Sequence, residues 1–461
     1  MRRTRSTKRS SIGTVITNAR ILTQNARRDQ IAGFLKIDPE GRIEAIGPAR
    51  KTPRKTKSHR FLDAAGSILT PGFVQCHVHL CQTLFRNSAD DLELMDWLGK
   101  RIWPLEASHS AASLALSARL GIFELLSSGT TTVLDMGTVR HTEAIFKVAD
   151  EMGIRANIGK CLMDHPTQNP PYLREDAADA LAEVEHLTAR WHRQRDDRLR
   201  VSLAPRFVIS CTEGLFEGIA KLSRAYGLLV HTHASENQKE IQIVREQVAC
   251  ENVEYLHRIG LVNRHLVLAH GIWLRPHEVD MLREGGASVV HCPGSNLKLA
   301  SGVARLVDLK THGINVALGT DGAACNNNLN AFGEMRLAAL IHKPGSGPRA
   351  VRAQEAFDLA TVNGARALHW DTTVGSLEVG KAADLTLIDL ERVRSTPYPD
   401  PVSALVYSTG PEQVQATMVQ GKWVYQTGQR ARLAEKTLAR QAVAASKTIE
   451  RAALNLTKSY P

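Results

Sequence analysis

The stretch Ser67-Ile-Leu-Thr-Pro-Gly-Phe-Val-Gln-Cys-His-Val-His79 decides the fold, because it is the first example of a sequence pattern that the chain repeats. It is a short apolar run that ends in polar residues and is followed by a helical stretch. Seven similar runs follow: Thr131–Met136, Ala156–Leu162, Arg200–Arg206, Leu228–His233, Leu266–His270, Ala287–His291 and Asn315–Asp321. Strands that alternate with amphipathic segments indicate parallel βαβ units. Eight such units predict an α/β fold, a closed (β/α)₈ TIM-like barrel.

The amphipathic segments between these runs predict the helices of the barrel. They are Ser110–Ser127, Thr142–Glu151, Asp176–Arg193, Thr212–Tyr226, Gln238–Ile259 and Pro276–Glu284. Apolar residues recur in them at the spacing of one helical face, which is the pattern of a helix packed on a sheet.

The two flanks of the barrel segment have a different pattern. Gly13–Gly47 and Ala382–Gly428 consist of short strands with turn signals, and they are expected to pair into one small β-domain made from both chain ends. Ala431–Lys458 is expected to form a surface helix or a frayed tail. The predicted division is a basic tail (1–11), the first part of the β-domain (12–68), the barrel (69–381), the second part of the β-domain (382–430) and the C-terminal helix or tail (431–461).

The net charge of +11 comes from two short segments. Residues 1–11 carry five Lys or Arg and residues 50–60 carry six, both without an acidic residue, so the remaining chain is close to neutral. Charge runs of this kind are typical of solvated tails and loops. Without a recognisable binding module, no nucleic-acid partner is expected.

The composition also indicates the cellular compartment in which the protein is expected. The chain has no apolar run of roughly 18 residues, so no membrane partner is expected, and its basic start is a poor signal peptide. Its seven cysteines include no CxxC pair, which argues against a disulfide framework and a cysteine-rich zinc site. We therefore expect a cytoplasmic protein with reduced thiols.

Two histidines, His77 and His79, end the first predicted strand. Strand residues two apart point to the same side, so both imidazoles can reach one ion. The pattern is weak alone, because 18 histidines in 461 residues give about 0.7 such pairs by chance.

Further polar residues fall at the carboxyl ends of other predicted strands. His231-Thr-His-Ala-Ser-Glu236 follows the fifth strand, His270 ends the sixth and Asp321 ends the eighth. Barrel enzymes build their sites at this face. Imidazole and carboxylate ligands suit Zn²⁺, with Fe²⁺ as second choice. Such a cation lowers the pKa of bound water from about 15.7 towards 7.

Glu236, three residues after His233, is placed to act as the general acid and base that such a water needs. Burial would raise the pKa of Glu236 so that it can donate a proton. Metal ligation would keep Asp321 ionised.

These segments resemble the amidohydrolase superfamily, in particular its branch of S-adenosylhomocysteine, methylthioadenosine and 5'-deoxyadenosine deaminases, with triazine hydrolases as relatives. The resemblance covers Val15 to Gly421, and it implies a β-sandwich made by both termini beside the barrel. The segments that carry it are Leu69-Thr-Pro-Gly-Phe-Val-Gln-Cys-His-Val-His-Leu80, His231-Thr-His-Ala-Ser-Glu236, His291-Cys-Pro-Gly-Ser-Asn-Leu-Lys-Leu-Ala-Ser301 and Leu318-Gly-Thr-Asp-Gly322.

The resemblance implies a role for each residue of the cluster. Glu236 would shuttle protons, and His270 would hydrogen-bond the nucleophile or the substrate without ligating the metal. His231 would be a supporting residue, because the family places its ligand three residues before the glutamate. The implied metal ligands are His77, His79, His233 and Asp321.

The resemblance also implies substrate contacts. Glu106, in Arg101-Ile-Trp-Pro-Leu-Glu106, matches a glutamate that holds ribose hydroxyls, for which a carboxylate acceptor is suitable. Arg206 stands where the homocysteine and methylthio enzymes have a histidine near the ring, as in the 5'-deoxyadenosine deaminases. Arg174 lies in a loop, together with Asp164 and His165, where related enzymes contact the substrate tail.

The predicted function is hydrolytic deamination of an adenosine-type nucleoside with one divalent metal ion, zinc first and iron second. The expected partner is a small molecule, and a homo-oligomer is compatible with the sequence. One alternative is an amidohydrolase for another heterocycle, such as a triazine, guanine or 8-oxoguanine. From another class, a non-catalytic purine-binding barrel is disfavoured, because every ligand candidate and Glu236 are present.

Overall fold

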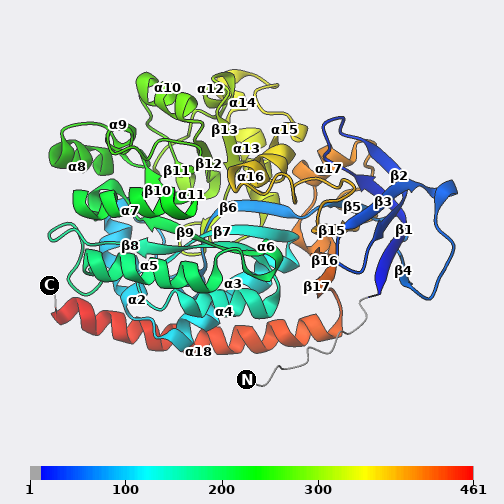
Figure 1. The fold of residues 1–461 in the computed structure, drawn as a ribbon, viewed down its shortest axis with the longest axis horizontal. Helices are drawn as coiled ribbons and strands as arrows, with labels where there is room; N and C mark the ends of the chain where they lie inside the picture. The colour runs from blue at the N-terminus through cyan, green and yellow to red at the C-terminus, as the bar shows by residue number, and fades with distance from the viewer. Residues whose placement is uncertain (1–11, 460–461) are drawn as a thin grey trace.

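A computed structural model describes residues 12–459, and the predicted basic tail 1–11 lies outside them. Parallel strands in chain order form the barrel (Figure 1). They are β6 (Phe73–His79), β7 (Thr130–Thr138), β8 (Arg155–Leu162), β9 (Leu199–Pro205), β10 (Val230–Ala234), β11 (Leu266–His270), β12 (Ser288–His291), β13 (Asn315–Leu318) and β14 (Asp321–Gly322). β13 pairs with β12, and β14 pairs with β6. The sheet therefore returns to its first strand, and the predicted TIM-like barrel is confirmed.

Two predicted strands are each divided at a glycine. Ser67–His79 forms β5 (Ile68–Pro71) and β6, separated by Gly72, where an added Cβ would lie 2.1 Å from the Thr131 side chain. Asn315–Asp321 forms β13 and the start of β14, separated by Gly319 and Thr320, and a Cβ at Gly319 would lie 2.7 Å from the His77 carbonyl oxygen. Close approach of neighbouring chains at these two points requires glycine.

Helices surround the barrel. Predicted Gln238–Ile259 is wrong as one helix, because Ala249 takes a left-handed conformation (φ 56°) that ends α8. The main barrel helices are α3 (Ala111–Ser127), α4 (Glu143–Met152), α5 (Ala177–Trp191), α7 (Glu213–Tyr226), α8 (Gln238–Val248), α9 (Asn252–Arg258), α10 (Pro276–Gly285), α11 (Pro293–Lys298), α12 (Leu306–Thr311), α13 (Ala331–Ile341), α15 (Ala353–Leu359) and α16 (Val362–Ala367).

Shorter elements connect these helices and strands. Among them η3 is a π-helix, a type that often occurs at functional sites. They are η1 (Ala49–Lys51), η2 (Leu80–Phe85), α1 (Leu94–Trp97), η3 (Leu98–Ile102), α2 (Trp103–Ala107), α6 (Gln194–Asp197), η4 (Val208–Ser210), α14 (Lys343–Ser346), α17 (Pro401–Tyr407) and η5 (Pro411–Gln413).

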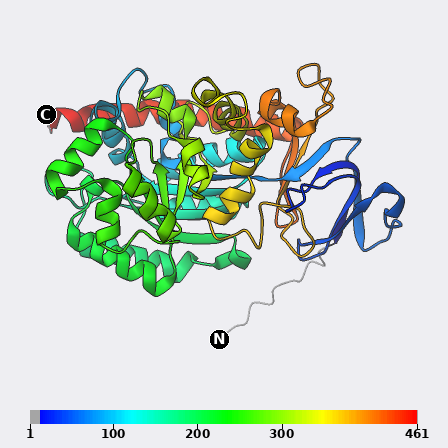
Figure 2. The same ribbon diagram turned by 90° about the horizontal axis from the view of Figure 1, so that it is seen from above.

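Both chain ends contribute to one further sheet, with the order β17-β16-β15-β5-β1-β2-β3 and β4 beside β1. Ile16, Leu35 and Met418, from both ends of the chain, share its apolar core. Figures 1 and 2 place this end sheet beside the barrel. Its remaining strands are β1 (Gly13–Leu22), β2 (Gln30–Ile37), β3 (Ile43–Pro48), β4 (His59–Asp63), β15 (Leu385–Ile388), β16 (Val414–Val419) and β17 (Lys422–Gln426).

The C-terminal segment forms a single long helix, α18 (Gln429–Ser459), which runs along one side of the molecule (Figure 1). It contacts α2 and α3, and it buries Leu438, Ile449 and Ala453. Within residues 12–459 no single helix has the length and apolarity to cross a membrane; only the bent pair Leu94–Ala107 and Ala111–Ser127, at 115° to one another, meets both criteria together.

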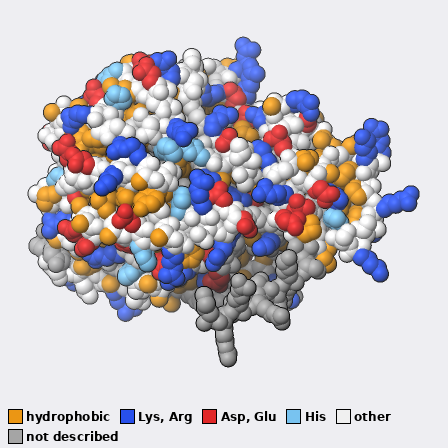
Figure 3. All heavy atoms as spheres, viewed as in Figure 1, with side chains coloured by type: hydrophobic (Ala, Val, Ile, Leu, Met, Phe, Trp, Pro, Cys, Tyr) orange, Lys and Arg blue, Asp and Glu red, His pale blue; other side chains and the backbone are white. Residues whose placement is uncertain are grey.

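Basic and acidic side chains intermingle over the face of the molecule shown in Figure 3. This distribution fits a chain whose charge excess is confined to two segments. One of these, residues 50–60, lies between β3 and β4 at the edge of the end sheet.

Candidate metal centre

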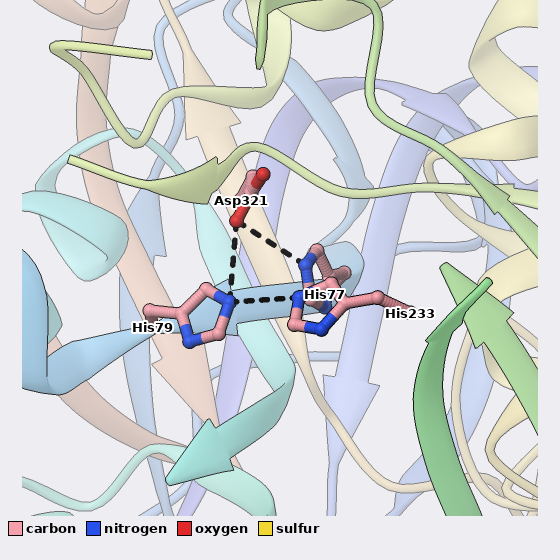
Figure 4. A group of neighbouring side chains, drawn as sticks. All are labelled: His77, His79, His233 and Asp321. Atoms are coloured by element: carbon pink, nitrogen blue, oxygen red, sulfur yellow. Dashed lines mark hydrogen bonds and ion pairs between the residues drawn. The ribbon is translucent and has the colours of Figure 1, made fainter. Parts of the chain in front are cut away.

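Strand ends at the carboxyl-terminal mouth of the barrel bring four predicted ligands together (Figure 4). His77 and His79 are on β6, and their spacing of two places both rings on the interior side. His233 is on β10, and Asp321 begins β14 in register with Val78. The closed barrel therefore places residues far apart in the sequence around one point.

The four side chains present their ligand atoms to a common centre. One atom from each lies within 4.8 Å of all the others, and all four residues are buried. Asp321 Oδ1 is 3.2 Å from His77 Nε2 and 3.3 Å from His79 Nε2. His79 Nε2 is 3.3 Å from His233 Nε2. Three imidazole nitrogens with one carboxylate oxygen form a donor set that zinc prefers, so these residues fit one divalent cation.

Hydrogen bonds on the outer side orient three of these groups. His233 Nδ1 donates to the Arg206 carbonyl at 2.7 Å, which leaves the Nε2 lone pair facing the centre. His77 Nδ1 lies 2.8 Å from His231 Nε2. Asp321 Oδ2 accepts from the Ser295 hydroxyl at 2.7 Å. His231 thus lies behind His77 and outside the group of four.

Backbone strain marks the same mouth. His270 and Asp321 have φ angles of 73° and 63°, in the left-handed region that residues with a Cβ seldom adopt. Each such residue costs on the order of 1–3 kcal/mol, and the cost persists only where the surrounding structure enforces it. Here the turns at the end of β11 and at the start of β14 bring the side chains of His270 and Asp321 towards each other.

Glu236 and His270 complete the cluster on one side. His270 Nε2 lies 3.5 Å from Glu236 Oε2 and 3.8 Å from Asp321 Oδ2, and His270 Nδ1 lies 2.8 Å from Asn296 Oδ1. Burial raises the pKa of Glu236 well above its ordinary value, and the nearby charge of Asp321 raises it further. Burial lowers the pKa of His270 to about 4. Burial therefore favours the protonated form of Glu236, and His270 is neutral at pH 7.

The charge of Asp321 is set by competing effects. Burial raises the pKa of its carboxyl, but the charges of His77 and His79 and a hydrogen bond from His77 oppose this effect, and the net pKa is well below its usual range. The surroundings thus favour the protonated carboxyl at Glu236 and the ionised carboxyl at Asp321, an arrangement suited to general acid–base chemistry beside a metal.

Two predicted substrate contacts, Glu106 and Arg206, pair with each other in the structure. Arg206 donates to both carboxylate oxygens of Glu106, one of them through Nη2 at 3.1 Å. Gln82 Nε2 donates to Glu106 Oε1 at 3.0 Å. Both charged groups are buried. The negative charge of the Glu106 carboxylate balances the positive charge of the Arg206 guanidinium.

One small cavity lies between Arg206 and the ligand cluster, and Glu106 is not part of its lining. Leu94, Trp97 and Leu98 cover it, and its volume of about 10 Å³ holds about one water molecule. The full lining is His79, Gln82, Leu94, Trp97, Leu98, Arg206, Phe207, His233, Glu236, His270, Leu299 and Asp321.

Arg174 does not reach this lining. It is exposed, and its Nη1 donates to the Pro166 carbonyl at 2.7 Å. Asp164 from the same loop accepts from the Thr212 backbone nitrogen and hydroxyl, at the start of α7. A contact between Arg174 and a substrate tail stays a prediction.

Sequence reasoning assigned no role to three polar residues that support the cluster. Ser295 holds Asp321, Asn296 holds His270, and Gln82 holds Glu106. Ser295 and Asn296 lie inside the motif His291–Ser301, and Gln82 lies two residues after the motif that ends at Leu80. The signal was present, but no spacing rule shows which side chain in a loop will turn towards a ligand.

The model of the amidohydrolase family matches residues 68–424. The chain is 37% identical over 386 residues to a 5'-deoxyadenosine deaminase of Methanothermobacter thermautotrophicus, covering 84% of this chain and 88% of the relative. It is 36% identical over 404 residues to a 5-methylthioadenosine/S-adenosylhomocysteine deaminase of Syntrophobacter fumaroxidans, covering 85% and 90%.

The structure is also similar to that of an adenosine deaminase from Xanthomonas campestris with bound zinc. The TM-score is 0.86 at 31% identity, covering 95% of this chain and 99% of the other. The family match spans most of the barrel, the end sheet from β5 to β17 and all four clustered ligands. The chain therefore belongs to the amidohydrolase family.

Proposed function

We propose that this chain is a zinc-dependent hydrolase that deaminates adenosine-type nucleosides of the 5'-deoxyadenosine, methylthioadenosine or S-adenosylhomocysteine class. The observation that carries the proposal is the buried group of His77, His79, His233 and Asp321 beside Glu236, whose pKa burial raises. Relatives that match over more than four fifths of the chain carry deaminase names.

The proposed chemistry uses a proton relay through Glu236. A divalent cation, when bound, supplies a hydroxide nucleophile at neutral pH. Glu236 gives its proton to N1 of the purine, and the π electrons of the N1–C6 bond move to N1 as hydroxide adds to C6. Glu236 then takes the hydroxide proton and passes it to the exocyclic amine. The C6–N bond breaks, ammonia leaves and a C6 carbonyl forms.

His270 has a positioning task in this scheme. Its Nδ1 is occupied by Asn296, so its neutral Nε2 faces Glu236 and Asp321. A neutral imidazole can hydrogen-bond the attacking oxygen without repelling the metal. In this tautomer Nε2 carries no proton to donate, so protonation of N1 is assigned to Glu236.

Ribose recognition is assigned to Glu106. Its carboxylate can accept from two vicinal hydroxyls, and Arg206 with Gln82 keeps it in place. We assign Arg206 to holding Glu106 and to the ring edge, and Arg174 to a 5' substituent that extends out of the cavity. The cover formed by Leu94, Trp97 and Leu98 must move outward for a nucleoside to enter, since the cavity holds about one water.

A second candidate is hydrolysis of another heterocycle such as a triazine or guanine, because the same metal chemistry displaces other leaving groups. The buried Glu106 favours the nucleoside, since a flat heterocycle without a sugar has no use for that acceptor. Glu106→Gln should raise KM for a nucleoside with little change in kcat, whereas turnover of a heterocycle should not change. A non-catalytic purine-binding barrel is disfavoured by the complete ligand set with Glu236.

Ammonia release from the zinc-loaded protein tests the proposal. The panel is 5'-deoxyadenosine, methylthioadenosine, S-adenosylhomocysteine, adenosine and guanine, and Glu236→Gln with full zinc content is the matched control. We expect release from an adenosine analogue and very little from the control. Absence of release from every adenosine analogue by metal-replete protein would reject the substrate class.

The proposal extends to the location of the protein, its partners and its domain division. We place the protein in the cytoplasm with a small-molecule partner, without nucleic acid or membrane, and compatible with a homo-oligomer. We propose the domain division 1–11, 12–68, 69–381, 382–430 and 431–461, with the end sheet folded as a β-sandwich. A core shared by Leu35 and Met418 supports the sandwich, because residues from both chain ends pack together there.

A further inference from the structure

The amino-terminal mouth of the barrel, opposite the metal centre, contains a bowl of about 830 Å³. Its floor consists of residues at the starts of strands: Asn157 on β8, Arg200 on β9, Ser288 on β12 and Asn315 on β13. Loops that precede the strands, the end of α7, and the end of α16 with the residues after it form its rim. The proposed deamination uses none of these residues, because its site is built at the strands' carboxyl ends.

Positive charge dominates the lining of this bowl. Its carboxylates are Asp197 and Asp371, and Arg200 pairs with Asp197 and lies 4.4 Å from the Trp370 ring. The other arginines make no ion pair within residues 12–459. The five arginines of the lining are Arg193, Arg200, Arg224, Arg264 and Arg366.

This excess is not a consequence of overall composition. The basic residues of 1–11 and 50–60 account for the net charge of the whole chain. Elsewhere basic and acidic residues nearly balance, so arginines without carboxylate partners around one concave surface are a local feature. Like charges held close together repel one another unless an anion lies between them.

Neutral polar groups lie between the arginines. Burial lowers the pKa of His192, and the charges of Arg193 and Arg200 lower it further, to about 4. Burial also lowers the pKa of His265, as do the neighbouring His369 and Arg264. These histidines are therefore neutral at pH 7.

Three buried polar atoms at the bowl have no hydrogen-bond partner among the described residues. They are Asn157 Oδ1, His192 Nε2 and His265 Nδ1. A buried polar atom without a partner is rare in folded proteins and calls for an explanation. All three belong to residues that line the floor or rim, so polar residues accompany the charged ones there, although these particular atoms are buried beneath the surface.

We propose that this bowl binds a small anion with several phosphate groups, of the di- or triphosphate class. Arginine is the residue best suited to phosphate, because its planar guanidinium donates two parallel hydrogen bonds. A bowl of 830 Å³ lies in the range of small-molecule sites, which is about 300–1,000 Å³. A free inorganic polyphosphate and the phosphate chain of a nucleotide share this chemistry.

Titration calorimetry on the full zinc-loaded chain with inorganic triphosphate and, separately, with adenosine triphosphate tests the proposal. Arg224→Gln and Arg264→Gln should each weaken triphosphate binding about tenfold, as expected for loss of a charge-assisted hydrogen bond. Arg336→Gln, an exposed arginine on α13 outside the bowl, is the matched control and should bind like the unmodified chain. The control variant also shows any heat that comes from chelation of zinc by triphosphate, because this heat would be the same in the unmodified chain and in all three variants.

Equal affinity of both inorganic triphosphate and the nucleotide would identify the phosphates alone as the recognised group. Tighter binding of the nucleotide, lost in the same two variants, would add a contact to its base or sugar. Triphosphate binding that is no stronger than chloride binding would overturn the proposal. Affinities of Arg224→Gln and Arg264→Gln within a factor of about two of the control would do the same.

Discussion

The two mouths of the barrel differ in how far their charged side chains are buried and paired. At the carboxyl-terminal mouth, carboxylates and imidazoles are buried, hydrogen-bonded from behind and covered by Leu94, Trp97 and Leu98. At the amino-terminal mouth, most arginines lie open to solvent without acidic partners. A buried and supported cluster is suited to chemistry, because fixed dipoles in a dry site act strongly on a reacting group. An open basic bowl is suited to reversible binding of an anion.

Among the expected effects on the two mouths, loss of a metal ligand at the carboxyl-terminal mouth should be the largest. His79→Ala removes one of the four donors at the covered mouth, so zinc should be bound less tightly and kcat/KM should fall by about a thousandfold or more. Metal analysis after dialysis, together with ammonia release, checks both effects. A variant that keeps full zinc and full activity would show that His79 is not a ligand.

Glu236→Gln should have the next largest effect. The variant keeps the shape of the side chain but cannot carry a proton, so kcat should fall about 10²–10⁴-fold while zinc content stays complete. Steady-state kinetics with matched metal analysis measure this difference. Equal turnover in Glu236→Gln and the unmodified chain would assign the proton relay to another group.

Burial of acidic groups near the covered mouth should make stability depend on pH. Burial raises the pKa of Asp135 on β7 to about 7, although backbone hydrogen bonds from Leu80 and Gly137 oppose this shift. The unfolded chain ionises Asp135 near pH 4, while the native state keeps its proton up to about pH 7. The free energy of unfolding should therefore fall as pH rises between these values, and level off above pH 7.

Asp135→Asn removes this dependence. Its amide oxygen can still accept from the Leu80 backbone nitrogen. Relative to the unmodified chain, the variant should gain on the order of 3 kcal/mol of stability between pH 4 and pH 7. Denaturant unfolding at pH 4, 5.5 and 7 measures the gain. A difference between the two proteins that is the same at all three pH values would contradict the expected pKa.

Asn296→Ala should have a moderate effect. The change frees Nδ1 of His270, so the imidazole loses its orientation, and kcat/KM should fall about 10–100-fold without loss of zinc. Ser110→Ala, at the exposed start of α3, is a control for general loss of stability. Kinetics that match those of the control would assign Asn296 a purely structural role.

Arg264→Gln in the bowl should have the smallest effect on deamination. The bowl and the cavity at the metal centre share no lining residue, so kcat/KM should stay within a factor of about two. Ammonia release with and without triphosphate checks this independence. A large loss of activity in Arg264→Gln alone would show that the two mouths are coupled.

The sequence predicted the covered mouth well because barrel geometry places chemistry at strand ends. His77, His79, His233 and Asp321 each stand at the carboxyl end of a run that could be located from its apolar pattern. Leu266–His270 was predicted with the same bounds that the structure has. The closing of the sheet then determines that these ends meet.

Other features could not be predicted from the sequence, because they depend on contacts between distant segments. Nothing in the residues around Glu106 shows that its carboxylate pairs with Arg206, a hundred positions later. Residue spacing did not indicate the break in the predicted helix 238–259 at Ala249, which is a left-handed backbone turn. The bowl has no motif, because its arginines come from separate elements, among them β9, α7 and α16.

An anomalous-scattering map at the zinc edge, from crystals of the metal-loaded protein, tests the central claim most directly. The account predicts one strong peak about 2.0–2.2 Å from Nε2 of His77, His79 and His233 and from a carboxylate oxygen of Asp321. A fully active, zinc-loaded protein whose peak lies elsewhere, with these four side chains turned away from it, would contradict the account.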